Sequence, residues 1–170
     1  MQRLLAPIFA RVGFEGSSNE AHLDSFLRSM VVSWACSMRM SDCTDKAREN
    51  YRTWMDQLNP DREDANPIDV NLKGVVYCTA ISEGDAEEWD FAWERYKNSN
   101  VGSEKSKLLQ AMSCIQDVWL LNRYLNMSLT SSSGIRQQDA RTVIATIAGN
   151  TVGRDLAFDF LRDKWDLVTE

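Results

Sequence analysis

Apolar residues recur at helical spacing along most of the chain. The clearest stripe follows the i, i+3, i+4, i+7 pattern of one helix face, and Ser18 or Asn19 can cap its start. It comprises Leu23, Phe26, Leu27, Met30, Val31, Trp34 and Ala35. Comparable stripes predict helices over residues 46–58, 72–84, 85–97, 140–149 and 152–165. Residues 104–126 predict one long helix or two short ones, followed by a loop over 128–134.

No segment alternates apolar and polar residues with the period of two that is typical of a strand. The predicted helices are short, are joined by short turns, and several are apolar on two sides, which favours stacked helices over a closed bundle. We therefore predict an all-α fold of stacked antiparallel helix pairs, forming a curved array like those of HEAT or armadillo repeats. The 3 prolines and 8 glycines leave little room for linkers, so residues 1–170 are expected to form a single domain.

The segment EGDAEEWDFAWERYKNSN at 83–100 concentrates aromatic residues among charges. At helical spacing Trp89 and Trp93 share one face, while Phe91 points to the opposite side. A helix with two apolar sides is expected to lie between neighbours, so these three side chains are predicted to belong to the core. Trp34 and Trp119 end apolar stripes of other helices and are predicted to be core residues too. An exposed binding surface is the alternative.

Composition excludes some partners. Hydrophobic residues make up 44% and charged residues 26% of the chain, as in globular proteins. The net charge of −6 leaves no basic surface for phosphates, which argues against nucleic acid and anionic membranes as partners. No apolar run approaches the roughly 20 residues that cross a bilayer.

The 4 cysteines, Cys36, Cys43, Cys78 and Cys114, leave two interpretations open. They lack the paired short spacing of zinc sites, so they are either buried thiols or two disulfides. Bridges Cys36–Cys43 and Cys78–Cys114 would close loops worth roughly 2.5 and about 4 kcal/mol in the chain-entropy model. Disulfides would indicate an oxidising compartment.

Motifs for catalysis are missing from the sequence. His22 is the single histidine, so the two-histidine zinc motif H-E-x-x-H cannot be present, and no nucleophile turn or phosphate loop is found. We therefore predict no catalytic residue, no metal ligand and no cofactor in this chain. The triplet NMS makes Asn126 a candidate for N-glycosylation, although such triplets often arise by chance.

Several longer stretches resemble one family. The blocks WDFAW at 89–93, NRYL at 122–125 and GRD at 153–155, within a match over about residues 2–168, resemble the C-terminal helical domain of the zinc aminopeptidases that include aminopeptidase N. The resemblance implies a bowl of stacked helices that closes over a catalytic domain and encloses a chamber for peptides. The family's zinc-binding and substrate motifs belong to preceding domains and do not occur here.

The resemblance also carries expectations about bonds, partners and location. It implies disulfides Cys36–Cys43 and Cys78–Cys114, zinc in the catalytic domain of the parent protein, and an extracellular or secretory-lumen location with a membrane-anchored parent. Expected partners are that catalytic domain, the peptide substrate, and a second copy in a homodimer. The alternative is a stand-alone helical module that binds a protein or peptide.

Overall fold

The computed structural model describes residues 2–17, 20–62 and 65–169, and these are helical with turns and no strand, as predicted. The predicted caps Ser18 and Asn19 lie outside the described residues. The chain divides into two compact units, residues 1–83 and 84–170. The single domain and the curved array of helix pairs stay predictions.

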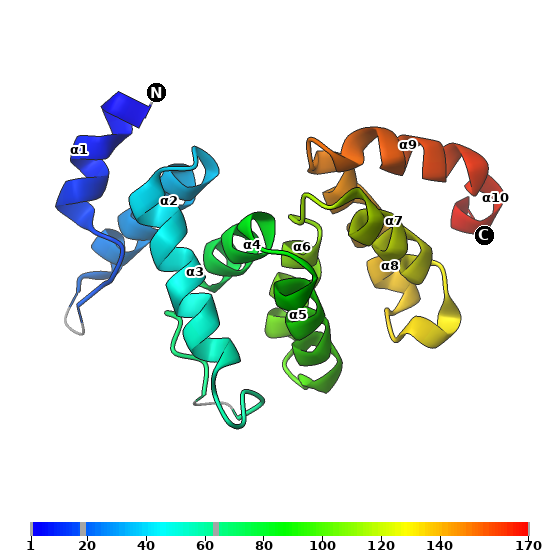
Figure 1. Ribbon diagram of the computed structural model, residues 1–170, viewed down its shortest axis with the longest axis horizontal. Helices are drawn as coiled ribbons and strands as arrows, with labels where there is room; N and C mark the ends of the chain where they lie inside the picture. Colours follow the sequence, from blue (N-terminus) through cyan, green and yellow to red (C-terminus); the bar gives the residue numbers. More distant parts are fainter. Residues whose placement is uncertain (1, 18–19, 63–64, 170) are drawn as a thin grey trace. The chain divides into compact units, whose positions relative to one another are not determined.

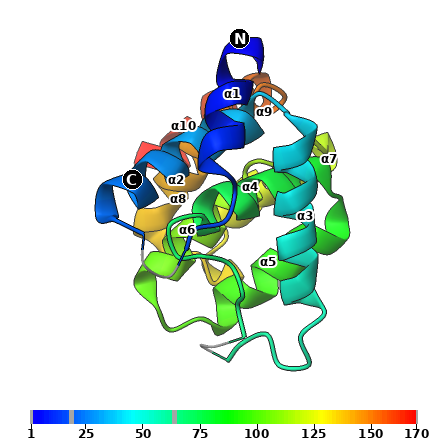
Figure 2. The ribbon, with the colours of Figure 1, turned by 90° about the vertical axis from the view of Figure 1, so that its left-hand side faces the viewer.

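The described part of the first unit contains four helices. They are α1 (Gln2–Val12), α2 (His22–Ser37), α3 (Ser41–Met55) and α4 (Lys73–Glu83). Helix α1 packs on α2, which in turn contacts both α3 and α4. Figures 1 and 2 show α3 and α4 side by side. Helix α3 ends at Met55 rather than at the predicted residue 58. Leu58 therefore lies in the following loop, and its side chain is fully exposed.

Three aromatic rings form the centre of the first unit. Trp54 stacks on Tyr77 with ring centroids 5.2 Å apart, and Tyr51 lies edge-on to both rings. The polar atoms of the cluster fasten the loop between α3 and α4. The indole Nε1 of Trp54 donates to the carbonyl of Pro60 at 3.1 Å, and the Asn66 amide donates to the Tyr77 hydroxyl at 2.6 Å. The loop is thereby held to the helices that it joins.

The second unit contains the remaining helices. They are α5 (Ala86–Asn98), α6 (Gly102–Met112), α7 (Val118–Ser128), the 3₁₀ turn η1 (Ser131–Ser133), α8 (Gln137–Gly149), α9 (Gly153–Asp163) and α10 (Trp165–Thr169). Helix α5 packs on α6, and α7, α8 and α9 contact one another (Figure 1).

Residues 104–126 form two helices, α6 and α7, rather than one. The carboxylate of Asp117 accepts hydrogen bonds from the backbone N–H groups of Trp119 at 2.7 Å and Leu120 at 3.4 Å. These groups lie in the first turn of a helix, where N–H donors have no partner within the helix. Asp117 therefore starts a new helix instead of continuing the one before it.

Gly153, at the start of α9, allows α8 and α9 to approach closely. A methyl group on Gly153 would lie 2.6 Å from the carbonyl oxygen of Ile147, whereas one on Gly149 would meet open space. We expect Gly153→Ala to lower the free energy of unfolding by about 1–3 kcal/mol through this clash. Gly149→Ala is the matched control and should be close to neutral in urea denaturation. Coinciding curves for the two variants would contradict the close approach.

Candidate functional site

The aromatic residues of α5 lie in the interior of the second unit. Trp89 is 0% and Trp93 8% exposed, and their rings stack with centroids 6.1 Å apart. The indole Nε1 of Trp89 donates to the carbonyl of Met112 at 3.1 Å, which joins α5 to the end of α6. Phe91 is half-buried, with the guanidinium of Arg95 4.9 Å from the centre of its ring. The segment 83–100 therefore serves mainly as packing rather than as an exposed binding surface.

Trp34 and Trp119 do not lie in the core, and the prediction for them is wrong. Trp34 is 57% exposed, because α2 buries a neighbouring face that includes Val32 and Cys36. Trp119 is 64% exposed, because the break at Asp117 restarts the helix and changes the direction in which position 119 points. Both tryptophans are therefore surface residues of this chain.

The exposed side of α2 carries five large apolar side chains, which we call the α2 face. Each of them is more than two-fifths exposed: Leu23, Phe26, Leu27, Met30 and Trp34. Their spacing places them in one stripe along the helix. Single exposed apolar residues are normal on protein surfaces, but a contiguous group marks a surface that another structure covers. The α2 face is therefore the strongest candidate binding surface of the first unit.

The exposed side of α7 is organised by Arg123. Its guanidinium lies 5.0 Å from the ring centre of the buried Trp89 and 5.8 Å from that of the exposed Trp119. The same group forms an ion pair with Asp90 at 3.2 Å. Arg123 thus connects α5 with α7 from the solvent side. In the sequence, Arg123 stands out only because it belongs to the NRYL block that carries the family resemblance.

Tyr124, the next residue of the same block, points inward. Its hydroxyl donates to the carbonyl of Leu109 at 2.8 Å, and burial raises the pKa of Tyr124 well above its ordinary value. The side chain therefore stays protonated and keeps this bond throughout the physiological pH range. Tyr124 is a structural link between α6 and α7.

An open groove lies beside α8 in the second unit. Its volume is about 540 Å³, and it is lined by apolar groups such as Ile144 and Leu167 together with Arg136 and Arg141. Arg136 donates to Asp139 at 2.7 Å, and this bond raises the pKa of Arg136. The groove thus combines apolar surface with two arginine side chains, one of them paired with Asp139.

The described residues do not form a metal centre. Across residues 2–17, 20–62 and 65–169, no three or more His, Cys, Asp or Glu side chains are grouped so that they could hold a metal ion. The zinc implied by the family resemblance therefore has no fitting donor set here, and no chemical step is assigned to these residues. In the same ranges no helix is both long enough and apolar enough to span a membrane.

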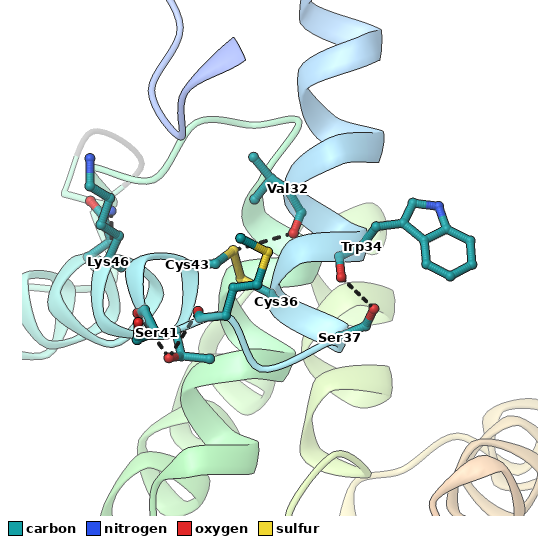
Figure 3. Close-up of a disulfide and its surroundings, with 10 residues drawn as sticks. Val32, Trp34, Cys36, Ser37, Ser41, Cys43 and Lys46 are labelled. Atoms are coloured by element: carbon teal, nitrogen blue, oxygen red, sulfur yellow. Dashed lines mark hydrogen bonds between the residues drawn. A yellow bond between two sulfur atoms is a disulfide. The ribbon is translucent and has the colours of Figure 1, made fainter. Parts of the chain in front are cut away.

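One predicted disulfide is directly visible. Cys36 at the end of α2 is bonded to Cys43 at the start of α3, with Cα atoms 5.2 Å apart (Figure 3). Both are buried, whereas the indole of Trp34 points away from the bridge. Cys78 and Cys114 are also disulfide-bonded, so no cysteine in the described part of the chain is free. Their predicted pairing with each other stays a prediction.

Sequence reasoning missed Arg28 of α2. Its side chain forms an ion pair with Glu20 and donates to the backbone carbonyls of Val12 and Gly13, the latter at 3.1 Å. Both charged side chains are only 13% exposed. Arg28 therefore fastens the end of α1 to α2. Nothing in the sequence distinguishes it from an ordinary surface arginine, because two of its three partners are backbone carbonyls, which no residue type marks.

Comparison with known proteins assigns the class of this chain. The profile of the ERAP1-like C-terminal domain matches residues 1–170, and the chain belongs to this family. It is 40% identical over 148 residues to aminopeptidase N of Bos taurus and 35% identical over 171 residues to aminopeptidase N of Homo sapiens. These alignments cover 87% and 97% of this chain.

A relative with a different name shows a similar match. The chain is 38% identical over 156 residues, 91% of its length, to the thyrotropin-releasing hormone-degrading ectoenzyme of Homo sapiens. The chain spans only 15%, 17% and 14% of these three relatives. The similarity therefore concerns one part of much longer proteins.

Proposed function

We propose that this chain is a noncatalytic C-terminal domain of a zinc aminopeptidase, which removes N-terminal residues from peptides. Its role is to enclose the chamber in which the peptide binds to the catalytic domain of the same parent protein. The match of the whole chain to a C-terminal domain family supports this role, as do aminopeptidase relatives of which the chain spans about one sixth. The zinc and its ligands would then belong to the catalytic domain.

The α2 face is the structural observation that supports contact with another domain. A protein that works alone would gain little from exposing Phe26, Met30 and Trp34 side by side. Covering a large apolar side chain contributes roughly 1.5–3 kcal/mol, so this stripe can hold a neighbouring domain in place. We assign the α2 face to contact with the preceding part of the parent protein. A homodimer contact is the other occupant that its chemistry would suit.

The location proposed for the parent is extracellular or in the secretory lumen, with a membrane anchor outside this chain. The buried Cys36–Cys43 bridge supports an oxidising compartment. One of the relatives carries the word ectoenzyme in its name, in agreement with this location.

The proposal is tested in the parent protein with the double substitution Phe26→Ser and Trp34→Ser. We expect the temperature of half-inactivation, assayed on an aminoacyl-anilide, to fall, because the contact between the domains loses roughly 1.5–3 kcal/mol per side chain. Turnover of longer peptides should change more than that of the small substrate, because the chamber is no longer closed. Leu58→Ser removes an isolated exposed side chain and is the matched control without effect.

Two results would contradict the proposal. The first is a parent whose thermal inactivation and peptide selectivity are both unchanged by the double substitution. The second is turnover of the aminoacyl-anilide by the 170-residue chain alone with zinc added, above a blank without protein. The isolated chain with both substitutions should keep its urea midpoint, which separates loss of the contact from loss of folding.

A further inference from the structure

The triplet Asn126–Met127–Ser128 forms the last turn of α7, and its two functional side chains lie in opposite environments. The side chain of Asn126 is exposed, whereas Ser128 is only 5% exposed. In N-glycosylation the asparagine amide is the acceptor and the hydroxyl two residues later is part of the recognised motif. In the folded protein the acceptor Asn126 is therefore accessible, whereas the recognised hydroxyl of Ser128 is not.

Hydrogen bonds in α7 strengthen this difference. The Ser128 hydroxyl donates to the carbonyl of Leu125 at 2.7 Å, inside the unit. The Asn126 amide nitrogen donates to the backbone carbonyl of Asn122 at 2.8 Å and to its side-chain oxygen at 3.2 Å. A transferase that reads both side chains would have to unwind this turn and expose Ser128.

We propose that Asn126 is an N-glycosylation site that is modified before α7 folds; this rests on the secretory location proposed above. The co-reactant is an oligosaccharide linked to dolichol pyrophosphate. The Asn126 Nδ2 forms a bond to the anomeric carbon of the sugar, and the bond from that carbon to the pyrophosphate oxygen breaks. Dolichol pyrophosphate leaves, and one proton of the amide passes to the transferase.

The folded helix accommodates the product. An asparagine amide has two N–H donors, and one remains after glycosylation. This donor can keep the bond to the carbonyl of Asn122, while the sugar extends into solvent from an exposed position. Trp119 and Asn122 precede Asn126 by seven and four residues, so they share its side of α7. The glycan therefore lies on the same surface as the exposed indole of Trp119 and keeps a large partner from docking there.

The site is tested in protein secreted from eukaryotic cells. Digestion with peptide-N-glycosidase in heavy-oxygen water should convert Asn126 to labelled aspartate, detected by mass spectrometry of its peptide. Asn126→Gln and Ser128→Ala should each abolish the label. Asn122→Gln, on the same face but outside the triplet, should leave it unchanged.

A second experiment measures whether glycosylation precedes folding. Unglycosylated protein is offered to microsomes loaded with the lipid-linked oligosaccharide, once folded and once unfolded with its disulfides reduced. We expect sugar transfer only to the unfolded form. Equal transfer to both forms would overturn modification before folding.

The same secreted sample separates failure of the site from failure of the proposed location. A Cys36–Cys43 bridge in the unreduced digest together with an unlabelled Asn126 would overturn the glycan and leave the location standing. Absence of both the bridge and the label would overturn both.

Discussion

Replacing Trp89 with Ala is expected to lower the free energy of unfolding by about 3–5 kcal/mol, the range for deleting a buried tryptophan. Trp89 is 0% exposed and lies between Trp93 and Tyr124, whose rings are centred 6.1 and 5.6 Å away. Its loss opens a cavity and also removes the hydrogen bond to the carbonyl of Met112, which is then left without this donor. The change should be measured by urea denaturation, followed by far-UV circular dichroism.

Trp119→Ala is the matched control, since it removes the same side chain from an exposed position of α7. It loses a contact with the Arg123 guanidinium at 5.8 Å, worth roughly 0.5–1 kcal/mol at a solvent-exposed site. The two variants should therefore differ several-fold in their effect on stability. Equal effects, or a stable Trp89→Ala protein, would show that α5 is not held in the way described.

The helical pattern was sufficient to predict the fold class and most helices, because a buried helix face leaves a period in the sequence. The period does not determine helix boundaries where the chemistry of a single residue starts or ends a helix. The apolar residues of 104–126 share one helix face only if a single helix runs through the whole segment. The carboxylate of Asp117 caps a new helix instead, and this changes which residues share a face. An aspartate just before an apolar run is a typical helix start, so Asp117 is the sequence signal for the break that leaves Trp119 exposed.

The exposure of Trp34 could not be predicted in this way. An apolar stripe shows that a face is covered, but it does not show whether the cover belongs to the same unit. In α2 the neighbouring face with Val32 and Cys36 packs inside the unit, and the α2 face remains exposed. If the parent protein covers that face, the stripe records a contact made outside this chain.

The candidate site was predictable only in part. The sequence leaves two interpretations for the four cysteines, buried thiols or two disulfides. The family resemblance then implies one particular disulfide pairing. Arg28 and the groove at Arg136 and Arg141 depend on contacts between segments distant in sequence, and no short motif encodes them. The proposed aminopeptidase role likewise comes from relatives and not from reactive groups in this chain.

Removal of the Cys36–Cys43 bridge is the second large effect expected. The double variant Cys36→Ala and Cys43→Ala should lower the free energy of unfolding by roughly 2.5 kcal/mol in the chain-entropy model, since the bridge closes a loop across a sequence separation of 7. Alanine is the better replacement, because both sulfurs are buried and a serine hydroxyl would need a new partner there. Urea denaturation under oxidising conditions measures the difference.

A reducing agent then distinguishes the contribution of the Cys36–Cys43 bridge to stability from that of the other disulfide bonding. It should destabilise the original chain through all of its disulfide bonding, and the double alanine variant only through the disulfide bonding at Cys78 and Cys114. Peptide mapping without reduction should join the peptides that carry these two cysteines, as the family resemblance implies. An unchanged urea midpoint in the double alanine variant would contradict a stabilising role for the Cys36–Cys43 bridge. A double variant insensitive to reduction would contradict a stabilising contribution from the disulfide bonding at Cys78 and Cys114.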